Sequence, residues 1–161
     1  MRAILLALFM AVTGCLTITS NEPTDLVKPD LTEGSKQQWN LMIGSWYGKQ
    51  PSKNGGHSEW IVNRYADGTY NIKFKFADSS QSEEVGEWGI SGGIYFSIFK
   101  GWLKKSQFRP ADPADPYNRD AYDILSLTED AFSYRHRETG DVYRVIKVAN
   151  DFRFTPSTDD K

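Results

Sequence analysis

The strongest constraint on the fold is a strict alternation of apolar and polar side chains between Thr69 and Ala77. Apolar residues take every second position and polar residues the positions between them: Tyr70, Ile72, Phe74 and Phe76 against Asn71, Lys73 and Lys75. Successive side chains of a β-strand point to opposite faces of a sheet. The alternation therefore predicts a strand with one buried face and one face in water.

Similar aromatic and β-branched runs recur along the chain at roughly the 8–12-residue spacing of all-β folds. Turn residues such as Asn54-Gly55-Gly56 and Thr139-Gly140-Asp141 separate them. The predicted strands are Ser45–Gln50, Glu59–Tyr65, Thr69–Ala77, Glu83–Ile90, Ile94–Trp102, Arg119–Leu127, Ala131–Arg137 and Val142–Val148.

The short turns between these strands predict hairpins, and consecutive hairpins make a meander. A meander of this length removes its exposed edges by closing on itself. We therefore predict an all-β fold: a small antiparallel up-and-down (meander) β-barrel of about eight strands. A short helical turn over Gln37–Ile43 precedes it, and Lys104–Asn118, rich in Pro and Asp, is expected to be a long loop.

The first predicted strand opens with Gly44-Ser45-Trp46-Tyr47-Gly48, directly after the helical turn. This segment resembles the Gly-x-Trp signature of the lipocalins and related calycins. The resemblance implies that Trp46 closes the barrel floor and packs on an arginine near the end of the barrel, either Arg144 or Arg153, through a cation–π contact. The chain resembles most the small bacterial lipocalin-like lipoproteins, which implies binding of an apolar or amphipathic small molecule. It departs from a typical lipocalin in its shorter barrel and its lack of a disulfide.

The N-terminus has the pattern of an export signal. Arg2 precedes the apolar run Ala3–Val12, which is too short to span a bilayer, since a span needs roughly 20 residues. The following Val12-Thr13-Gly14-Cys15 resembles the lipobox of bacterial lipoproteins. The resemblance implies that residues 1–14 are removed and that Cys15 is lipidated with diacylglycerol and a further acyl chain such as palmitate.

The residue after the cysteine is Leu16 rather than the aspartate associated with inner-membrane retention, which favours the outer membrane. Residues 15–36 are polar, include two prolines, and are expected to be the lipidated N-terminus and a flexible tether. Residues 37–155 are expected to form the barrel domain, and residues 156–161 a polar tail. The predicted location is the outer membrane, with the domain facing the periplasm.

Seven aromatic residues of the predicted strands are candidates for a ligand pocket: Trp60, Tyr70, Phe74, Phe76, Trp88, Tyr95 and Phe99. Ligand sites combine apolar walls with a few polar groups, as these side chains would. The alternative is that the same residues fill the barrel as a packed core, because a short barrel has little spare volume.

No group of residues in the sequence points to catalysis or to a metal. The two histidines, His57 and His136, are far apart, and no Gly-x-Ser-x-Gly motif is present. Asp112, Asp115 and Asp120 share one segment with Tyr117 and Asn118. That segment is either a calcium loop or lid, or a set of ordinary solvated turns. The acidic residues Glu83, Glu84 and Glu87 are expected to be solvated strand positions.

These features predict a non-enzymatic protein without cofactor, metal or catalytic residues. A net charge of −2 gives no reason to expect nucleic acid as a partner. The predicted function is that of a membrane-anchored periplasmic lipoprotein whose barrel binds or carries a small hydrophobic molecule. The alternative is an envelope structural or protein-interaction lipoprotein with a filled barrel and no ligand. The expected partners are the membrane, through the lipid anchor, and that small molecule, while the sequence names no protein partner.

Overall fold

The computed structural model describes residues 33–52 and 55–155. The described residues do not include the predicted leader, the predicted acylation site Cys15, the first part of the predicted tether or the predicted polar tail. None of the helices within the described residues has the length and apolar character needed to cross a membrane.

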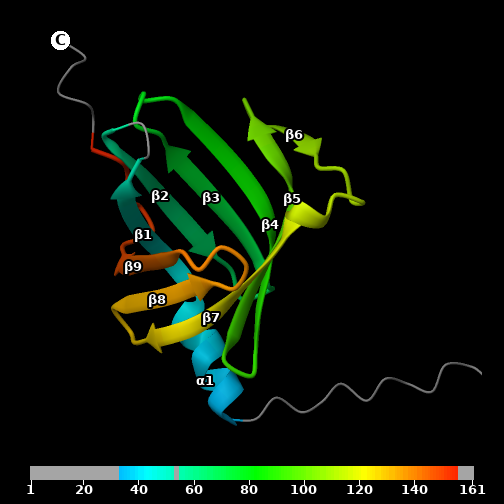
Figure 1. Cartoon of the computed structure of the whole chain (residues 1–161), viewed down its shortest axis with the longest axis vertical. Coiled ribbons are helices and arrows are strands. Elements are labelled where there is room, and N and C mark those ends of the chain that lie inside the picture. The colour runs from blue at the N-terminus through cyan, green and yellow to red at the C-terminus, as the bar shows by residue number, and fades with distance from the viewer. Residues whose placement is uncertain (1–32, 53–54, 156–161) are drawn as a thin grey trace, which may run out of the picture. The chain divides into compact units, whose positions relative to one another are not determined.

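One short helix precedes a run of antiparallel strands (Figure 1). The helical elements are α1 (Glu33–Met42) and the 3₁₀ turn η1 (Pro116–Asn118). The strands are β1 (Gly44–Pro51), β2 (His57–Arg64), β3 (Thr69–Lys75), β4 (Gln81–Ser91), β5 (Ile94–Lys104), β6 (Gln107–Pro110), β7 (Arg119–Leu127), β8 (Ala131–His136) and β9 (Val142–Val148).

The sheet closes into a barrel of eight strands. Consecutive strands from β1 to β5 pair with one another, β5 pairs with β7, and the chain returns through β8 and β9 to β1. All of these pairings are antiparallel, which confirms the predicted all-β meander barrel. Closure leaves none of the eight strands with a free edge along its whole length.

The ninth strand, β6, was not predicted, and it lies inside the expected loop Lys104–Asn118. It pairs only with the end of β5, from Gly101↔Pro110 to Lys104↔Gln107. The turn between them has positive φ at Lys105 and Ser106, the geometry of a tight hairpin turn normally held by Asn or Gly. Because neither position holds Asn or Gly, the residue pattern does not predict this hairpin.

Helix α1 lies across the end of the barrel where β1 begins, and we call this end the closed end (Figure 1). The indole of Trp39, in α1, stacks on that of Trp88 with the ring centroids 4.2 Å apart. Met42, the last residue of α1, is fully buried. The ammonium of Lys147 donates to the carbonyl oxygens of Leu41 (2.9 Å) and Ile43 (2.5 Å). A cation at a helix C-terminus satisfies carbonyls that the helix leaves unpaired. The helix begins at Glu33, earlier than the predicted turn at Gln37.

Trp46 occupies the centre of the closed end, as the resemblance implied. Its side chain is 0% exposed, and its Nε1 donates to the Met42 carbonyl at 2.9 Å. The prediction of an arginine partner for Trp46 was wrong. Nζ of Lys147 lies over the indole, 4.7 Å from the ring centroid. In β9 the alternation turns Val145 and Lys147 inward, so Arg144 is exposed on the outer face.

Arg153 is not the partner of Trp46 either. Its Nη1 donates to the carbonyl of the adjacent Phe152, and its side chain is exposed. The cation that does lie inside the barrel, besides Lys147, is Arg64, which is 2% exposed. Its guanidinium carbon is 4.9 Å from the Tyr95 ring centroid, and Nη2 donates to the Tyr95 hydroxyl at 3.2 Å.

Aromatic rings fill the closed half of the barrel. Phe132 stacks on Tyr134 at 4.5 Å, and Tyr95 meets both of these rings at 5.6–5.7 Å between centroids. Tyr134 and Tyr122 continue the contacts toward the middle of the barrel, 5.1 Å apart. Interlocking rings at such separations exclude a large ligand from this half.

Candidate ligand site at the barrel mouth

The seven aromatic candidates separate into two groups along the barrel. Four are buried in the packed core, namely Trp60, Tyr70, Trp88 and Tyr95. The other three lie toward the end opposite α1, which we call the mouth: Phe74 and Phe99 are half-buried, and Phe76 is 40% exposed. The packed-core interpretation thus describes the first group, and the mouth is where a ligand could reach aromatic walls.

Strand register identifies which side chains face into the mouth. Directly opposed residues of neighbouring antiparallel strands point to the same side of a sheet. Ile72 lies opposite Glu84, which in turn lies opposite Trp102. Because Ile72 shares its face with the core residue Tyr70, Glu84 and Trp102 also face inward. By the same argument Ser82, opposite Phe74, lines the mouth.

The expectation that all three glutamates of β4 are solvated was wrong for Glu84. The other two glutamates of β4 do point outward. Glu83 accepts a hydrogen bond from Asn71 at 2.6 Å, and Glu87 pairs with Lys100 at 3.2 Å. Glu84 has no such partner among the described residues, and burial raises the pKa of its carboxyl. The inner wall therefore carries an unpaired, partly desolvated carboxyl group.

Replacing Glu84 by Gln is expected to stabilise the fold at neutral pH and to have little effect in acid. Below the ordinary pKa of 4.5 the carboxyl is neutral in both the folded and the unfolded chain. As the pH rises through that value toward the raised pKa, the unfolded chain ionises first, so the folded state loses stability. Glutamine has no charge to desolvate, and the melting temperature of Glu84→Gln should exceed that of wild type only at the higher pH.

The matched control is Glu138→Gln, because Glu138 is an exposed residue of the β8–β9 turn. Thermal unfolding of the three proteins on both sides of the glutamate pKa measures the effect. A melting-temperature difference for Glu84→Gln that is the same at both pH values would show that its carboxyl is fully solvated.

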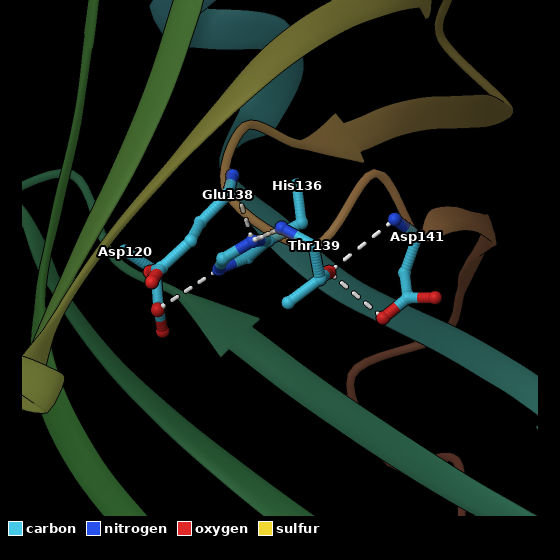
Figure 2. Close-up of polar contacts among 5 residues, drawn as sticks. All are labelled: Asp120, His136, Glu138, Thr139 and Asp141. Atoms are coloured by element: carbon cyan, nitrogen blue, oxygen red, sulfur yellow. Dashed lines mark hydrogen bonds and ion pairs between the residues drawn. The ribbon is translucent and has the colours of Figure 1, made fainter.

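The part of the mouth formed by β7 and β8 holds a carboxylate fixed by a histidine (Figure 2). His136, at the end of β8, accepts hydrogen bonds at Nδ1 from the backbone N–H groups of Glu138 (3.2 Å) and Thr139 (3.0 Å). Nδ1 is therefore unprotonated, and the ring proton lies on Nε2. Nε2 then donates to Oδ1 of Asp120 on β7, at 3.1 Å.

Both nitrogens of His136 are thus engaged. The nitrogen that could accept a proton, Nδ1, already accepts from two backbone N–H groups of its own turn. Thr139 is fixed in turn, since its hydroxyl donates to Asp141 at 2.8 Å and accepts from the Asp141 N–H at 3.3 Å (Figure 2). The role that the geometry gives His136 is to orient Asp120 at the mouth.

The other aspartates of this region serve the backbone. Oδ1 of Asp112 accepts from the Ala114 N–H at 2.9 Å, and Oδ1 of Asp115 accepts from the Tyr117 N–H at 2.9 Å, where it caps η1. These are ordinary turns of the kind Asp favours, which agrees with the solvated-turn interpretation rather than a calcium loop. Within residues 33–52 and 55–155, no three His, Cys, Asp or Glu side chains are grouped as metal ligands.

Two open hollows flank the hairpin that joins β3 to β4 at the mouth. One, of about 490 Å³, lies between β4 and the β5–β6 hairpin, where Ser82, Trp102 and Arg109 line it. The other, of about 620 Å³, lies between the β1–β2 and β3–β4 turns, with Phe76 in its wall. Both are in the size range of small-molecule sites, about 300–1,000 Å³.

No protein-family model and no curated protein sequence matches the chain. Among solved structures, it is similar to a lipocalin-like protein from Bacteroides uniformis, with 16% sequence identity and a TM-score of 0.44. The alignment covers 67% of this chain and 99% of that one. The barrel assignment rests on the strand pairing of the chain itself.

Proposed function

We propose that this chain is a lipid-anchored periplasmic lipoprotein whose barrel binds a small amphipathic molecule in its open mouth. One observation carries the binding role. Inward-facing side chains at the closed end are buried, whereas inward-facing apolar side chains at the mouth stay exposed to water, Trp102 at 44%. A filled barrel would bury both groups, so the exposed aromatic wall supports a cup that a ligand can occupy.

The filled closed half sets the size of the ligand. The alternative of a solid barrel fits this half, where Trp46 and the rings around Phe132 leave no large cavity. A ligand must then be shallow, resting on Phe74, Phe99 and Trp102 rather than reaching the floor. Binding would cover part of the exposed aromatic surface and draw its free energy from that burial.

The polar groups of the mouth set the chemistry of the ligand. Glu84 on β4 and Asp120 on β7 are carboxyl groups of the mouth, and Oγ of Ser82 is buried without a hydrogen-bond partner among the described residues. Carboxylates accept hydrogen bonds and repel anions. Around Glu84 and Asp120 the mouth therefore favours a polar part that donates hydrogen bonds, whereas Arg109, on the same face as Trp102, supplies a cation at the β5–β6 edge.

A mouth-filling substitution tests this function. Ser82→Phe should reduce the affinity for a neutral apolar dye such as N-phenyl-1-naphthylamine by more than about tenfold, because the new ring takes the space of the ligand. Ser126→Phe places the same ring on the exposed outer wall and should bind like wild type. Dye fluorescence titration gives both affinities. Equal dye binding by Ser82→Phe and wild type, with the fold intact by circular dichroism, would count against a site in the mouth.

A further inference from the structure

The β5–β6 hairpin has a composition unlike the rest of the chain. Residues 100–110 read KGWLKKSQFRP, with four basic residues and no acidic one. Because the whole chain carries a net charge of −2, everything outside this hairpin sums to −6. Lys100 pairs with Glu87 at 3.2 Å, while Lys104, Lys105 and Arg109 have no ion-pair partner among the described residues.

The hairpin also exposes large aromatic side chains. Trp102 is 44% exposed and Phe108 is 54% exposed. Trp102 lies opposite Arg109 and Leu103 opposite Phe108, so the two aromatic rings are on opposite faces of the ribbon. Strand β6 pairs with β5 alone, and the end of the hairpin projects away from the barrel (Figure 1). Neither the core nor another strand covers these rings.

We propose that this hairpin docks on a phospholipid bilayer that contains anionic lipid. Tryptophan and phenylalanine partition into the interface between headgroups and acyl chains, and nearby Lys and Arg side chains bind lipid phosphates. The projecting ribbon presents both kinds of side chain together, with Lys105 at its tip. An apolar surface that met only another protein would not need this excess of unpaired cations.

The charge distribution also sets the orientation. An anionic bilayer attracts the hairpin and repels the acidic remainder of the chain, so the domain would approach the membrane hairpin first. Trp102 belongs both to the hairpin and to the mouth wall, so docking brings the mouth next to the bilayer. The docking itself does not depend on whether the mouth holds a ligand.

Trp102 is a built-in probe for the test. Of the five tryptophans, Trp46, Trp60 and Trp88 are buried and Trp39 is half-buried, so Trp102 is the exposed indole. The full-length protein, as the cell processes it, is mixed with vesicles of phosphatidylcholine brominated on its acyl chains, with or without phosphatidylglycerol. Bromine quenches indoles that enter the bilayer, so Trp102 emission should fall only with phosphatidylglycerol. Trp102→Phe should abolish the quenching.

A charge variant isolates the electrostatic part. Each Lys or Arg near an anionic surface contributes about fivefold to partitioning. Because the lipid anchor already holds the protein on the vesicle, replacing Lys104, Lys105 and Arg109 by Gln should shift the equilibrium between docked and undocked hairpin by about a hundredfold, and Trp102 quenching should fall to the level seen without phosphatidylglycerol. The matched control replaces three exposed cations elsewhere by Gln and should quench like wild type: Lys49, Lys73 and Arg144.

Three outcomes would overturn the proposal. The first is no quenching of Trp102 in any vesicle, and the second is equal loss of quenching in the control triple variant. The third is shielding of Trp102 from a soluble quencher without vesicles, in protein stripped of bound small molecules, which would mean that another protein chain covers it. Dye binding in the mouth is measured separately with Ser82→Phe, so failure of the docking and failure of the ligand site give different results.

Discussion

Replacing Trp46 by Ala is expected to lower the free energy of unfolding by about 3–5 kcal/mol, as for other fully buried Trp residues. The side chain is 0% exposed and meets Phe132 edge-on at 6.2 Å. Its loss would also leave the Met42 carbonyl without the hydrogen bond from Trp46 Nε1, and it would remove the ring beneath the Lys147 ammonium. The Lys147 ammonium is partly desolvated, so loss of its contact with the ring adds to the destabilisation caused by the cavity.

Equilibrium denaturation in urea measures this effect. Trp102→Ala is the matched control, since it removes the same side chain from an exposed position and should cost far less. If Trp46→Ala were no more destabilising than Trp102→Ala, the indole would not be the plug of the closed end, and the family resemblance would lose its structural basis.

Replacing Cys15 by Ser is expected to release the protein from the membrane fraction. Two or more acyl chains on one cysteine anchor a protein stably, whereas serine cannot receive the thioether-linked diacylglycerol. Cell fractionation followed by mass measurement of the protein tests both the location and the acyl mass.

The control for this experiment separates the anchor from the hairpin. The triple Gln variant of Lys104, Lys105 and Arg109 keeps Cys15 and should stay with the membrane, since a surface contact of one hairpin is weak beside covalent lipid. Full membrane retention of Cys15→Ser after an alkaline carbonate wash would refute the lipid anchor.

The arrangement of the barrel strands could be predicted because it follows from local pattern. Period-two alternation in Thr69–Ala77 indicates which face is buried, and glycine-containing turns mark the reversals after β1, β2, β4 and β8. Trp46 was placed by a short motif and its position after a helical turn, and the structure puts it at the closed end.

Other features depend on contacts that no local pattern specifies. The β6 strand follows a tight turn at Lys105 and Ser106 that lacks the usual Asn or Gly, so its residues were predicted to be part of a loop. The choice of Lys147 over Arg144 depends on the register of β9 against β1, where Trp46 lies opposite Lys147. A shift of one residue would bring Ile146 or Val148 opposite Trp46, and only a shift of three residues would bring Arg144 there.

The candidate site was predictable in its aromatic part and not in its polar part. Glu84 stands among other acidic residues of β4, and only the pairing with Ile72 shows that it faces inward. Asp120 and His136 are separated by a whole hairpin, and the tautomer of the histidine follows from the turn at Glu138 and Thr139. Such contacts form only when the barrel closes, so they cannot be predicted from local sequence patterns.

Native mass spectrometry of the protein isolated gently from cells tests the central claim that the mouth is an occupied cup. The account predicts a population with one additional non-covalent small mass, present in wild type and in Ser126→Phe and lost in Ser82→Phe. Covalent acyl chains would add the same mass to all three proteins and so would not interfere. Only the bare acylated mass in every sample, together with no dye binding by wild type, would contradict the account.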